Sequence, residues 1–139
     1  ETGEEQVEAN SMKALEQVKM LEFIDKPPHH LSFGQKRKIA IASVLASEPE
    51  LLVLDEPSSN LDPASRRELI DILKNLKVSI ILVTHDLPMA LEICNRSIIL
   101  NNGQITADAD TYKILKDSKV MEENRLELPF GFALHHLEE

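Results

Sequence analysis

Two kinds of hydrophobic pattern alternate along this chain, and each predicts a different element of secondary structure. Unbroken aliphatic runs, with no polar interruption on either side, predict short β-strands buried on both faces. The first run is residues 51–54, and the second is residues 80–83 within the predicted strand 79–84. Longer segments carry apolar residues at helical spacing and predict helices. They cover residues 12–24, 31–47 and 63–76, and the helix over 31–47 is apolar nearly all round, so we expect it to be buried. The polar, acidic residues 1–11 are expected to fray.

Capping and turn residues set the limits of these elements. Ser32 and Asp62 are predicted N-caps, the second followed by a proline at the first helical position. Asn-Gly at 102–103 lies between two short apolar runs and predicts a β-hairpin. Further helices are expected over 87–94 and 110–117, and the tail from Ser118 is expected to be another helix or a docked coil. Strand, helix and strand in succession predict a parallel pair with a right-handed crossover, and therefore an α/β fold.

Composition narrows the class of protein. The chain has 139 residues, 42% of them hydrophobic but only 4% aromatic, which predicts one domain with an aliphatic core. Its net charge of −9 argues against nucleic acid as a partner, because nucleic-acid binding is driven by phosphate neutralisation. The single cysteine, Cys94, cannot form an internal disulfide. No apolar run is long enough to cross a bilayer, and the first residues do not resemble a signal peptide. We expect a soluble, cytosolic protein, which leaves open docking onto a membrane partner.

Two candidate catalytic residues follow the end of the first predicted strand. Asp55 and Glu56 follow the aliphatic run directly, and Pro57 stops the strand. In an open parallel sheet, ligands bind at the carboxyl ends of the strands. An Asp there can hold Mg²⁺, and the adjacent Glu can polarise a water nucleophile. The alternative interpretation is a buried strand that merely ends in a solvated acidic turn.

Three further features point in the same direction. Residues 31–35 lie at a predicted helix start, where free amides and the helix dipole attract phosphate; Gly34 allows close backbone approach and Ser32 offers a hydroxyl. A polar turn at 58–62 follows Glu56 immediately. His85 follows the second strand, from which it could contact a γ-phosphate.

Taken together, these segments resemble the ATP-binding cassette (ABC) ATPases over residues 12–107. Residues 31–35 look like the family's signature motif, 51–56 like its Walker B strand, 59–62 like its D-loop, and His85 like its switch histidine. The resemblance implies ATP and Mg²⁺ as cofactors, with Glu56 and His85 catalytic and Asp55 at the metal. It assigns nucleotide contacts to five residues: Ser32, Phe33, Gly34, Gln35 and Asp62.

The resemblance also implies an architecture and partners. The fold would be the C-terminal part of a P-loop NTPase (RecA-like) domain with part of the ABC helical subdomain. Its parts would be the helical subdomain and signature helix (12–48), the catalytic core (49–107) and a helical tail (108–139). Pro27-Pro28-His29-His30 and the tail 123–129 resemble the ATPases of cobalt or nickel importers and of energy-coupling-factor importers. A second ABC ATPase subunit and a transmembrane transporter subunit are then the implied partners, at the cytoplasmic face of the membrane.

The chain departs from the family pattern in two places. Phe33 stands where the signature usually has glycine. No Gly-x-x-x-x-Gly-Lys-Ser/Thr phosphate loop is present, since none of the four glycines is followed by Lys and then Ser or Thr. We therefore expect the chain alone not to hydrolyse ATP. Two alternatives remain open: a non-transport ABC ATPase of DNA repair or translation, and a non-hydrolysing fragment that binds a partner.

Several other residues are predicted to be structural. The histidine pairs at 29–30 and 135–136 lack metal-ligand spacing to a third donor. In the basic run 36–38 the two outward residues are expected to be solvated. Cys94 is expected to be a small core residue. The apolar segment 128–132 either packs back on the domain or meets a partner.

Overall fold

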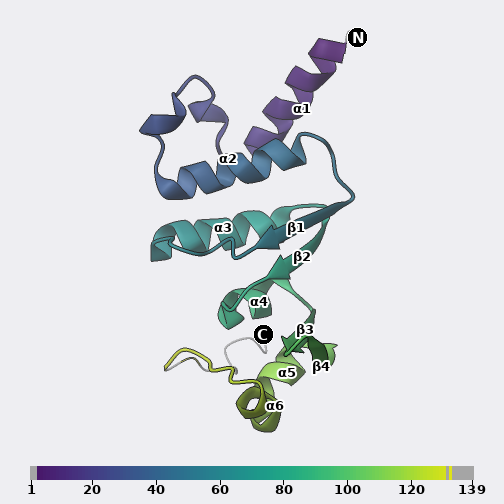
Figure 1. The fold of residues 1–139 in the computed structure, drawn as a ribbon. Coiled ribbons are helices and arrows are strands. Elements are labelled where there is room, and N and C mark those ends of the chain that lie inside the picture. Colours follow the sequence, from purple (N-terminus) through teal and green to yellow (C-terminus); the bar gives the residue numbers. More distant parts are fainter. Residues whose placement is uncertain (1–2, 131, 133–139) are drawn as a thin grey trace. The chain divides into compact units, whose positions relative to one another are not determined.

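The computed structural model describes residues 3–130 and 132, which form two compact units (Figure 1). The N-terminal unit, Glu1–Val83, contains α1 (Gly3–Gln17), the 3₁₀ turns η1 (Leu21–Phe23) and η2 (Pro28–His30), α2 (Phe33–Leu45), β1 (Leu51–Asp55), α3 (Pro63–Asn75) and β2 (Ser79–Val83). The C-terminal unit, Thr84–Glu139, contains α4 (Leu87–Ile93), β3 (Arg96–Asn101), β4 (Gln104–Asp110), α5 (Thr111–Lys116) and α6 (Ser118–Glu123).

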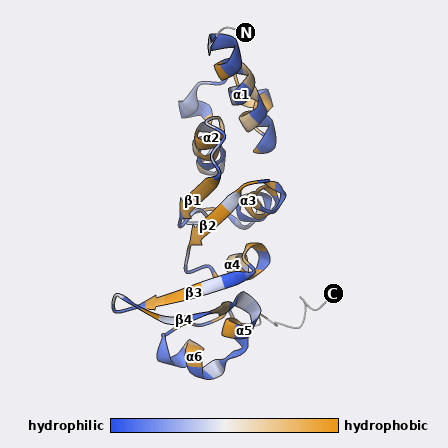
Figure 2. Ribbon diagram, turned by 90° about the vertical axis from the view of Figure 1, so that its right-hand side faces the viewer, coloured by the Kyte–Doolittle hydropathy of each residue, from blue (hydrophilic) through white to orange (hydrophobic). Residues whose placement is uncertain are grey.

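A parallel pair of strands forms the centre of the N-terminal unit. β1 and β2 pair in register from Leu51 opposite Ser79 to Asp55 opposite Val83. The connection between them is α3, which lies beside both strands in the two views (Figures 1 and 2). Its apolar stripe is buried and consists of Leu69, Ile70, Ile72 and Leu73. The predicted strand–helix–strand unit with parallel strands is therefore confirmed.

The prediction that both faces of these strands are buried is wrong within this unit. Burial alternates along β1, with Leu52 and Leu54 buried but Val53 59% exposed. Because successive side chains point to opposite faces, one face of the sheet is packed and the other is open. The open face carries four exposed apolar side chains: Leu51, Val53, Ile81 and Val83. The ribbon of β1 and β2 is largely coloured as hydrophobic in Figure 2.

The first helix differs from its prediction at both ends. It begins at Gly3, with Glu4 and Glu5 in its first turn, where negative charge is favoured by the helix dipole. It ends at Gln17 rather than continuing to residue 24. Lys19 adopts a left-handed conformation (φ 56°) and its N–H donates to the Glu16 carbonyl, while the Met20 N–H donates to Leu15. This is the Schellman pattern that terminates a helix.

The second helix begins as predicted but is not buried all round. Ser32 is its N-cap, and the buried stripe consists of Lys38, Ile41, Ala42 and Leu45. The opposite side is open, with Val44 46% exposed. Within the described unit, α1 and α3 pack on α2.

The C-terminal unit is built on the predicted hairpin. β3 and β4 are antiparallel, and both turn residues have positive φ, 51° at Asn102 and 75° at Gly103, as a type I′ turn requires. Arg96 and Asp108 form a bidentate ion pair across the strands, with both distances 2.7 Å, and this lowers the pKa of the Asp108 carboxyl. The expected helices near 87–94 and 110–117 are present, and the tail forms α6 at its start. Within the residues described, no helix is both long and apolar enough to span a membrane.

We predict that the isolated chain self-associates through the open face of β1 and β2. Its exposed strands offer unpaired backbone groups and apolar side chains to a second copy. The double substitution Val53→Thr with Ile81→Thr should weaken association by about tenfold, since it replaces apolar groups on that face by hydroxyls. Size-exclusion chromatography with light scattering measures this, with Val44→Thr on the exposed side of α2 as control. A monomeric wild-type chain at all concentrations would contradict the prediction.

Candidate functional site

The carboxyl end of β1 carries the two acidic residues that the sequence singled out. Asp55 is the last residue of the strand and lies opposite Val83, and its side chain is exposed. Glu56 remains attached to the neighbouring strand, because its N–H donates to the Val83 carbonyl at 2.8 Å. The pairing with β2 therefore holds both acids at the edge of the sheet where parallel strands present ligand-binding groups.

Glu56 has an unusual backbone conformation. Its φ is +46°, in the left-handed region that residues with a Cβ rarely adopt. The next residue, Pro57, is fully buried, and the Ser59 N–H donates to the Glu56 carbonyl at 3.2 Å. A strained residue of this kind persists only where its surroundings fix it, and such residues cluster at functional sites.

A tight turn connects this acidic pair to α3. The Leu61 N–H donates to the Ser58 carbonyl at 3.2 Å, and Asn60 is left-handed with φ 60°. Asp62 then caps α3, accepting bonds from the Ser65 N–H at 3.0 Å and from the Ser65 hydroxyl at 2.7 Å. The hydrogen bond from the Ser65 backbone is the main cause of a lowered pKa at Asp62. Both carboxylate oxygens of Asp62 thus serve the helix cap.

The start of α2 is a complete capping box. The Ser32 hydroxyl accepts from the Gln35 N–H at 3.2 Å, and the Gln35 side-chain oxygen accepts from the Ser32 N–H at 2.8 Å. The N–H groups of the first two helical positions, Phe33 and Gly34, have no intrahelical partner by the geometry of a helix start. These amides, at the positive end of the helix dipole, suit a phosphate oxygen.

Gly34 also has a structural role that the sequence did not reveal. A Cβ at this position would lie 2.9 Å from the Ser65 hydroxyl oxygen, 3.0 Å from the Ser65 Cβ and 3.7 Å from Leu61 Cδ2. The first turns of α2 and α3 therefore approach closely, and the predicted signature and D-loop segments meet at this point.

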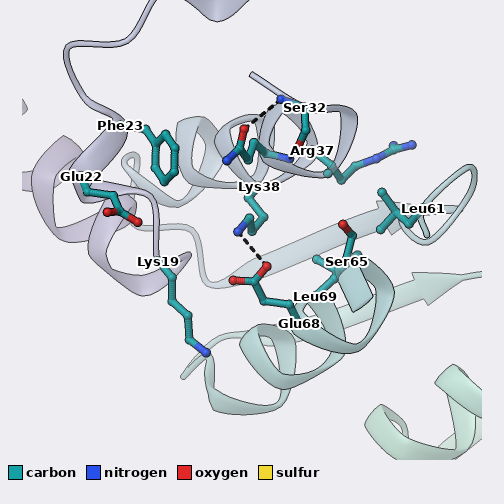
Figure 3. A pocket seen from close by; sticks show the side chains of 12 residues that line it. Lys19, Glu22, Phe23, Ser32, Arg37, Lys38, Leu61, Ser65, Glu68 and Leu69 are labelled. Atoms are coloured by element: carbon teal, nitrogen blue, oxygen red, sulfur yellow. Dashed lines mark hydrogen bonds and ion pairs between the residues drawn. The ribbon is translucent and has the colours of Figure 1, made fainter. Parts of the chain in front are cut away.

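A cavity of about 250 Å³ lies beside this contact (Figure 3). Its walls come from the 19–23 segment, α2, the end of the turn and α3; the lining residues are Lys19, Glu22, Phe23, Ser32, Gly34, Gln35, Arg37, Lys38, Leu61, Ser65, Glu68 and Leu69. Across it Lys38 Nζ meets a Glu68 carboxylate oxygen at 3.0 Å. Lys38 lies on the buried stripe of α2, three and four residues before Ile41 and Ala42. That spacing was the sequence signal for its burial, whereas Lys36 is solvated as expected.

Phe33, the departure from the family signature, is on the outer side of this helix start. Its side chain is 53% exposed, and the Arg37 guanidinium lies over the ring at 5.5 Å from the centroid. The phenyl group therefore projects into solvent and is partnered by a cation one turn further along α2.

His85 belongs to the C-terminal unit, two residues beyond the end of β2. It is exposed, and its carbonyl accepts from the Leu87 N–H at 3.0 Å at the start of α4. Asp86 caps that helix through the Met89 N–H at 3.0 Å. The histidine therefore sits in an ordered turn rather than in a free loop.

The described side chains do not form a metal site made of protein ligands alone. Within residues 3–130 and 132, no three His, Cys, Asp or Glu side chains gather into a possible metal site. Mg²⁺ typically takes one or two protein carboxylates together with water and substrate phosphates, so the exposed Asp55 fits that ion. His29 and His30 stack edge to face on each other, with centroids 4.3 Å apart, and the pair at 135–136 lies outside the described residues. Cys94 is half-buried, and burial raises the pKa of its thiol.

Comparisons with known proteins agree with this arrangement. A family model described as AAA domain, putative AbiEii toxin, Type IV TA system matches residues 25–92. A putative ABC transporter ATP-binding protein of Streptomyces avermitilis is 63% identical over 131 residues, covering 94% of this chain and 50% of that protein. The energy-coupling factor transporter ATP-binding protein EcfA2 of Mycoplasmopsis pulmonis is 44% identical, over 91% of this chain and 43% of that protein. The chain spans about half the length of the relatives it matches.

A solved structure shares the fold. It is cbiO1 from Clostridium perfringens, described as part of the ABC transporter complex cbiONQ, with a TM-score of 0.76 and 32% identity over 93% of this chain and 53% of that one. The predicted α/β fold of a P-loop NTPase domain is confirmed by this likeness. By sequence and fold the chain matches ABC transporter ATP-binding proteins, among them an energy-coupling factor transporter ATP-binding protein and cbiO1.

We predict that Gly34→Ala lowers the free energy of unfolding by about 1–3 kcal/mol, since the new methyl group overlaps Ser65. Ser65→Gly removes that obstacle, so Gly34→Ala should be much milder in the Ser65→Gly background. Urea denaturation of the four proteins in this cycle measures the coupling. The control is Gly3→Ala, whose Cβ would meet nothing within 4 Å. Equal effects of Gly34→Ala in both backgrounds would contradict the close approach.

Proposed function

We propose that this chain is the signature and Walker B part of an ATP-hydrolysing subunit that powers an ABC importer of the energy-coupling-factor or cobalt type. The observation that carries the proposal is the acidic pair at the carboxyl end of β1, fixed by its pairing with Val83 and by the left-handed Glu56. The names of the relatives support the transporter class.

The side chains at the end of β1 would supply the chemistry. Asp55 would hold Mg²⁺, which when bound neutralises charge on the transferring phosphoryl group. Glu56 would act as general base, orienting a water and accepting its proton on a carboxylate oxygen. His85 would contact the γ-phosphate from the next strand. No covalent step on the protein is needed, because positioning and charge stabilisation supply the rate enhancement.

The start of α2 would act on a second nucleotide. Ser32, Gly34 and Gln35 would close on ATP held by a facing ATPase subunit, with the free amides of the first turn directed at its phosphates. The turn through Asp62 would accompany them, and the exposed Phe33 would lie at the rim of that contact. ATP binding would then draw the two subunits together, and hydrolysis would release them.

In this proposal the phosphate loop and the transmembrane subunit lie outside these 139 residues. A phosphate loop from elsewhere in the complete protein would hold ATP beside Asp55. A transmembrane subunit would convert closure of the dimer into transport, with the ATPase bound at the cytoplasmic face of the membrane. Relatives about twice as long as the chain are consistent with this division.

In the complete protein, Glu56→Gln should reduce ATP turnover by about 10²–10⁴-fold, because it removes the proton acceptor while keeping the size of the side chain. ATP binding should persist, since the amide retains the shape of the site. A steady-state phosphate-release assay and a nucleotide titration measure the two effects. Glu50→Gln, an exposed residue just before β1, is the matched control. Unchanged turnover in Glu56→Gln would refute the proposal.

The 139-residue chain by itself should not bind Mg-ATP in the micromolar range, because its sequence contains no phosphate loop. Isothermal titration calorimetry of the isolated chain with ATP measures this. The complete protein serves as the positive control. A micromolar dissociation constant for the isolated chain would show that the binding pocket is already present within it.

A further inference from the structure

The buried lysine of α2 carries an inference beyond the catalytic residues. Lys38 is only 8% exposed and is the one charged residue buried among those the structure describes. Burying an ammonium group is costly unless it is paired, because the charge loses its hydration. Its partner is Glu68 on α3, at 3.0 Å, whose side chain is 40% exposed (Figure 3). The pair therefore fixes the spacing of two helices that start at the two predicted motifs.

The placement of this pair along the helices is informative. Lys38 lies just under two helical turns beyond the cap Ser32, and Glu68 lies the same distance beyond the cap Asp62. The same helices already touch in their first turns, where Gly34 lets Ser65 approach. Two contacts at different positions along α2 and α3 fix both the distance between the helices and their relative rotation. A single contact would leave the helices free to pivot.

A third, weaker contact extends the link into the turn. Arg37 Nη2 lies 3.5 Å from the Ser59 carbonyl, within the predicted D-loop. Signature helix, turn and α3 are thus connected by side chains from one stretch of α2. That stretch is the basic run whose outward residues were expected only to be solvated.

We propose that the Lys38–Glu68 ion pair is a positioning contact that makes the signature helix and the D-loop turn move as one body when the ATPase dimer closes. This inference rests on the proposed function. Lys38 and Glu68 do not touch the nucleotide in this scheme. They hold the amides of Phe33 and Gly34 in a fixed relation to the turn at Ser59 and Asp62, so that both segments reach the facing nucleotide together.

Loss of either charge should slow ATP hydrolysis in the complete protein. Lys38→Met keeps most of the side-chain volume but removes the charge, and Glu68→Gln removes the opposite charge. Each should lower kcat for ATP hydrolysis by about tenfold or more, since small misplacements of positioning groups are costly to catalysis. The KM for ATP should change little, because in this scheme a subunit's own nucleotide is held elsewhere. Lys38→Arg should restore most of the turnover.

Two readouts separate positioning from simple stability. ATP-driven dimerisation, measured by light scattering in the Glu56→Gln background, should weaken by at least tenfold in Lys38→Met. The double variant Lys38→Met with Glu68→Gln should be no worse than either single variant. A lower melting temperature with unchanged kcat and dimerisation below that temperature would assign the pair to stability alone and overturn the inference.

The exposed ion pair Lys13–Glu48, at 2.6 Å, provides the matched control, and Lys13→Met should leave every readout unchanged.

If Lys38→Met does not fold, the reversed pair Lys38→Glu with Glu68→Lys is the second test. Recovery of turnover relative to each reversal alone supports the inference, and no recovery overturns it. Glu56→Gln distinguishes the two levels of proposal. If Glu56→Gln abolishes turnover while Lys38→Met matches wild type, only the positioning role fails; if Glu56→Gln has no effect, the proposed function fails.

Discussion

The parallel pairing of β1 with β2 is the constraint on which the candidate site depends. It brings the carboxyl ends of two strands to one edge, and the bond from the Glu56 N–H to the Val83 carbonyl extends the ladder past the last residue of β1. The left-handed turn at Glu56 and the buried Pro57 follow from that anchor. The chain then has a short path to Asp62 and α3, and α3 in turn gives α2 a surface on which to pack. The register of β1 against β2 therefore positions the acidic pair, then the turn to α3, and through α3 the start of α2.

The close packing of α2 on α3 adds a second level of organisation. The neighbouring Ser65 leaves no room for a Cβ at position 34, and in the proposed function a nucleotide would also approach this glycine. In the proposed function the start of α2 would therefore serve both helix packing and nucleotide contact with the same residue. Selection for the packing and selection for the chemistry would be hard to separate by mutation of Gly34 alone.

Much of this arrangement was predictable from local sequence signals. The caps Ser32 and Asp62, the Asn-Gly turn and the parallel crossover each depend on residues close in sequence, and the structure has them where they were expected. The errors have another origin. An aliphatic run does not say how many of its faces are covered, so Val53 is exposed although its strand was expected to be buried. The end of α1 depends on a left-handed Lys19, a residue type with no preference for that conformation. The spacing of Lys38 from Ile41 and Ala42 marks it as part of the buried stripe, but its partner Glu68 is thirty residues away, and a pairing at that distance leaves no local pattern.

The conformation of Glu56 places fold and chemistry in conflict at a single residue. A left-handed backbone costs a residue with a Cβ roughly 1–2 kcal/mol, whereas glycine adopts it readily. Glu56→Gly would therefore relieve strain while removing the carboxylate. Glu56 shares this conformation with other non-glycine residues such as Lys19 and Glu48, but in the proposed function a stabilising Glu56→Gly would also remove the general base.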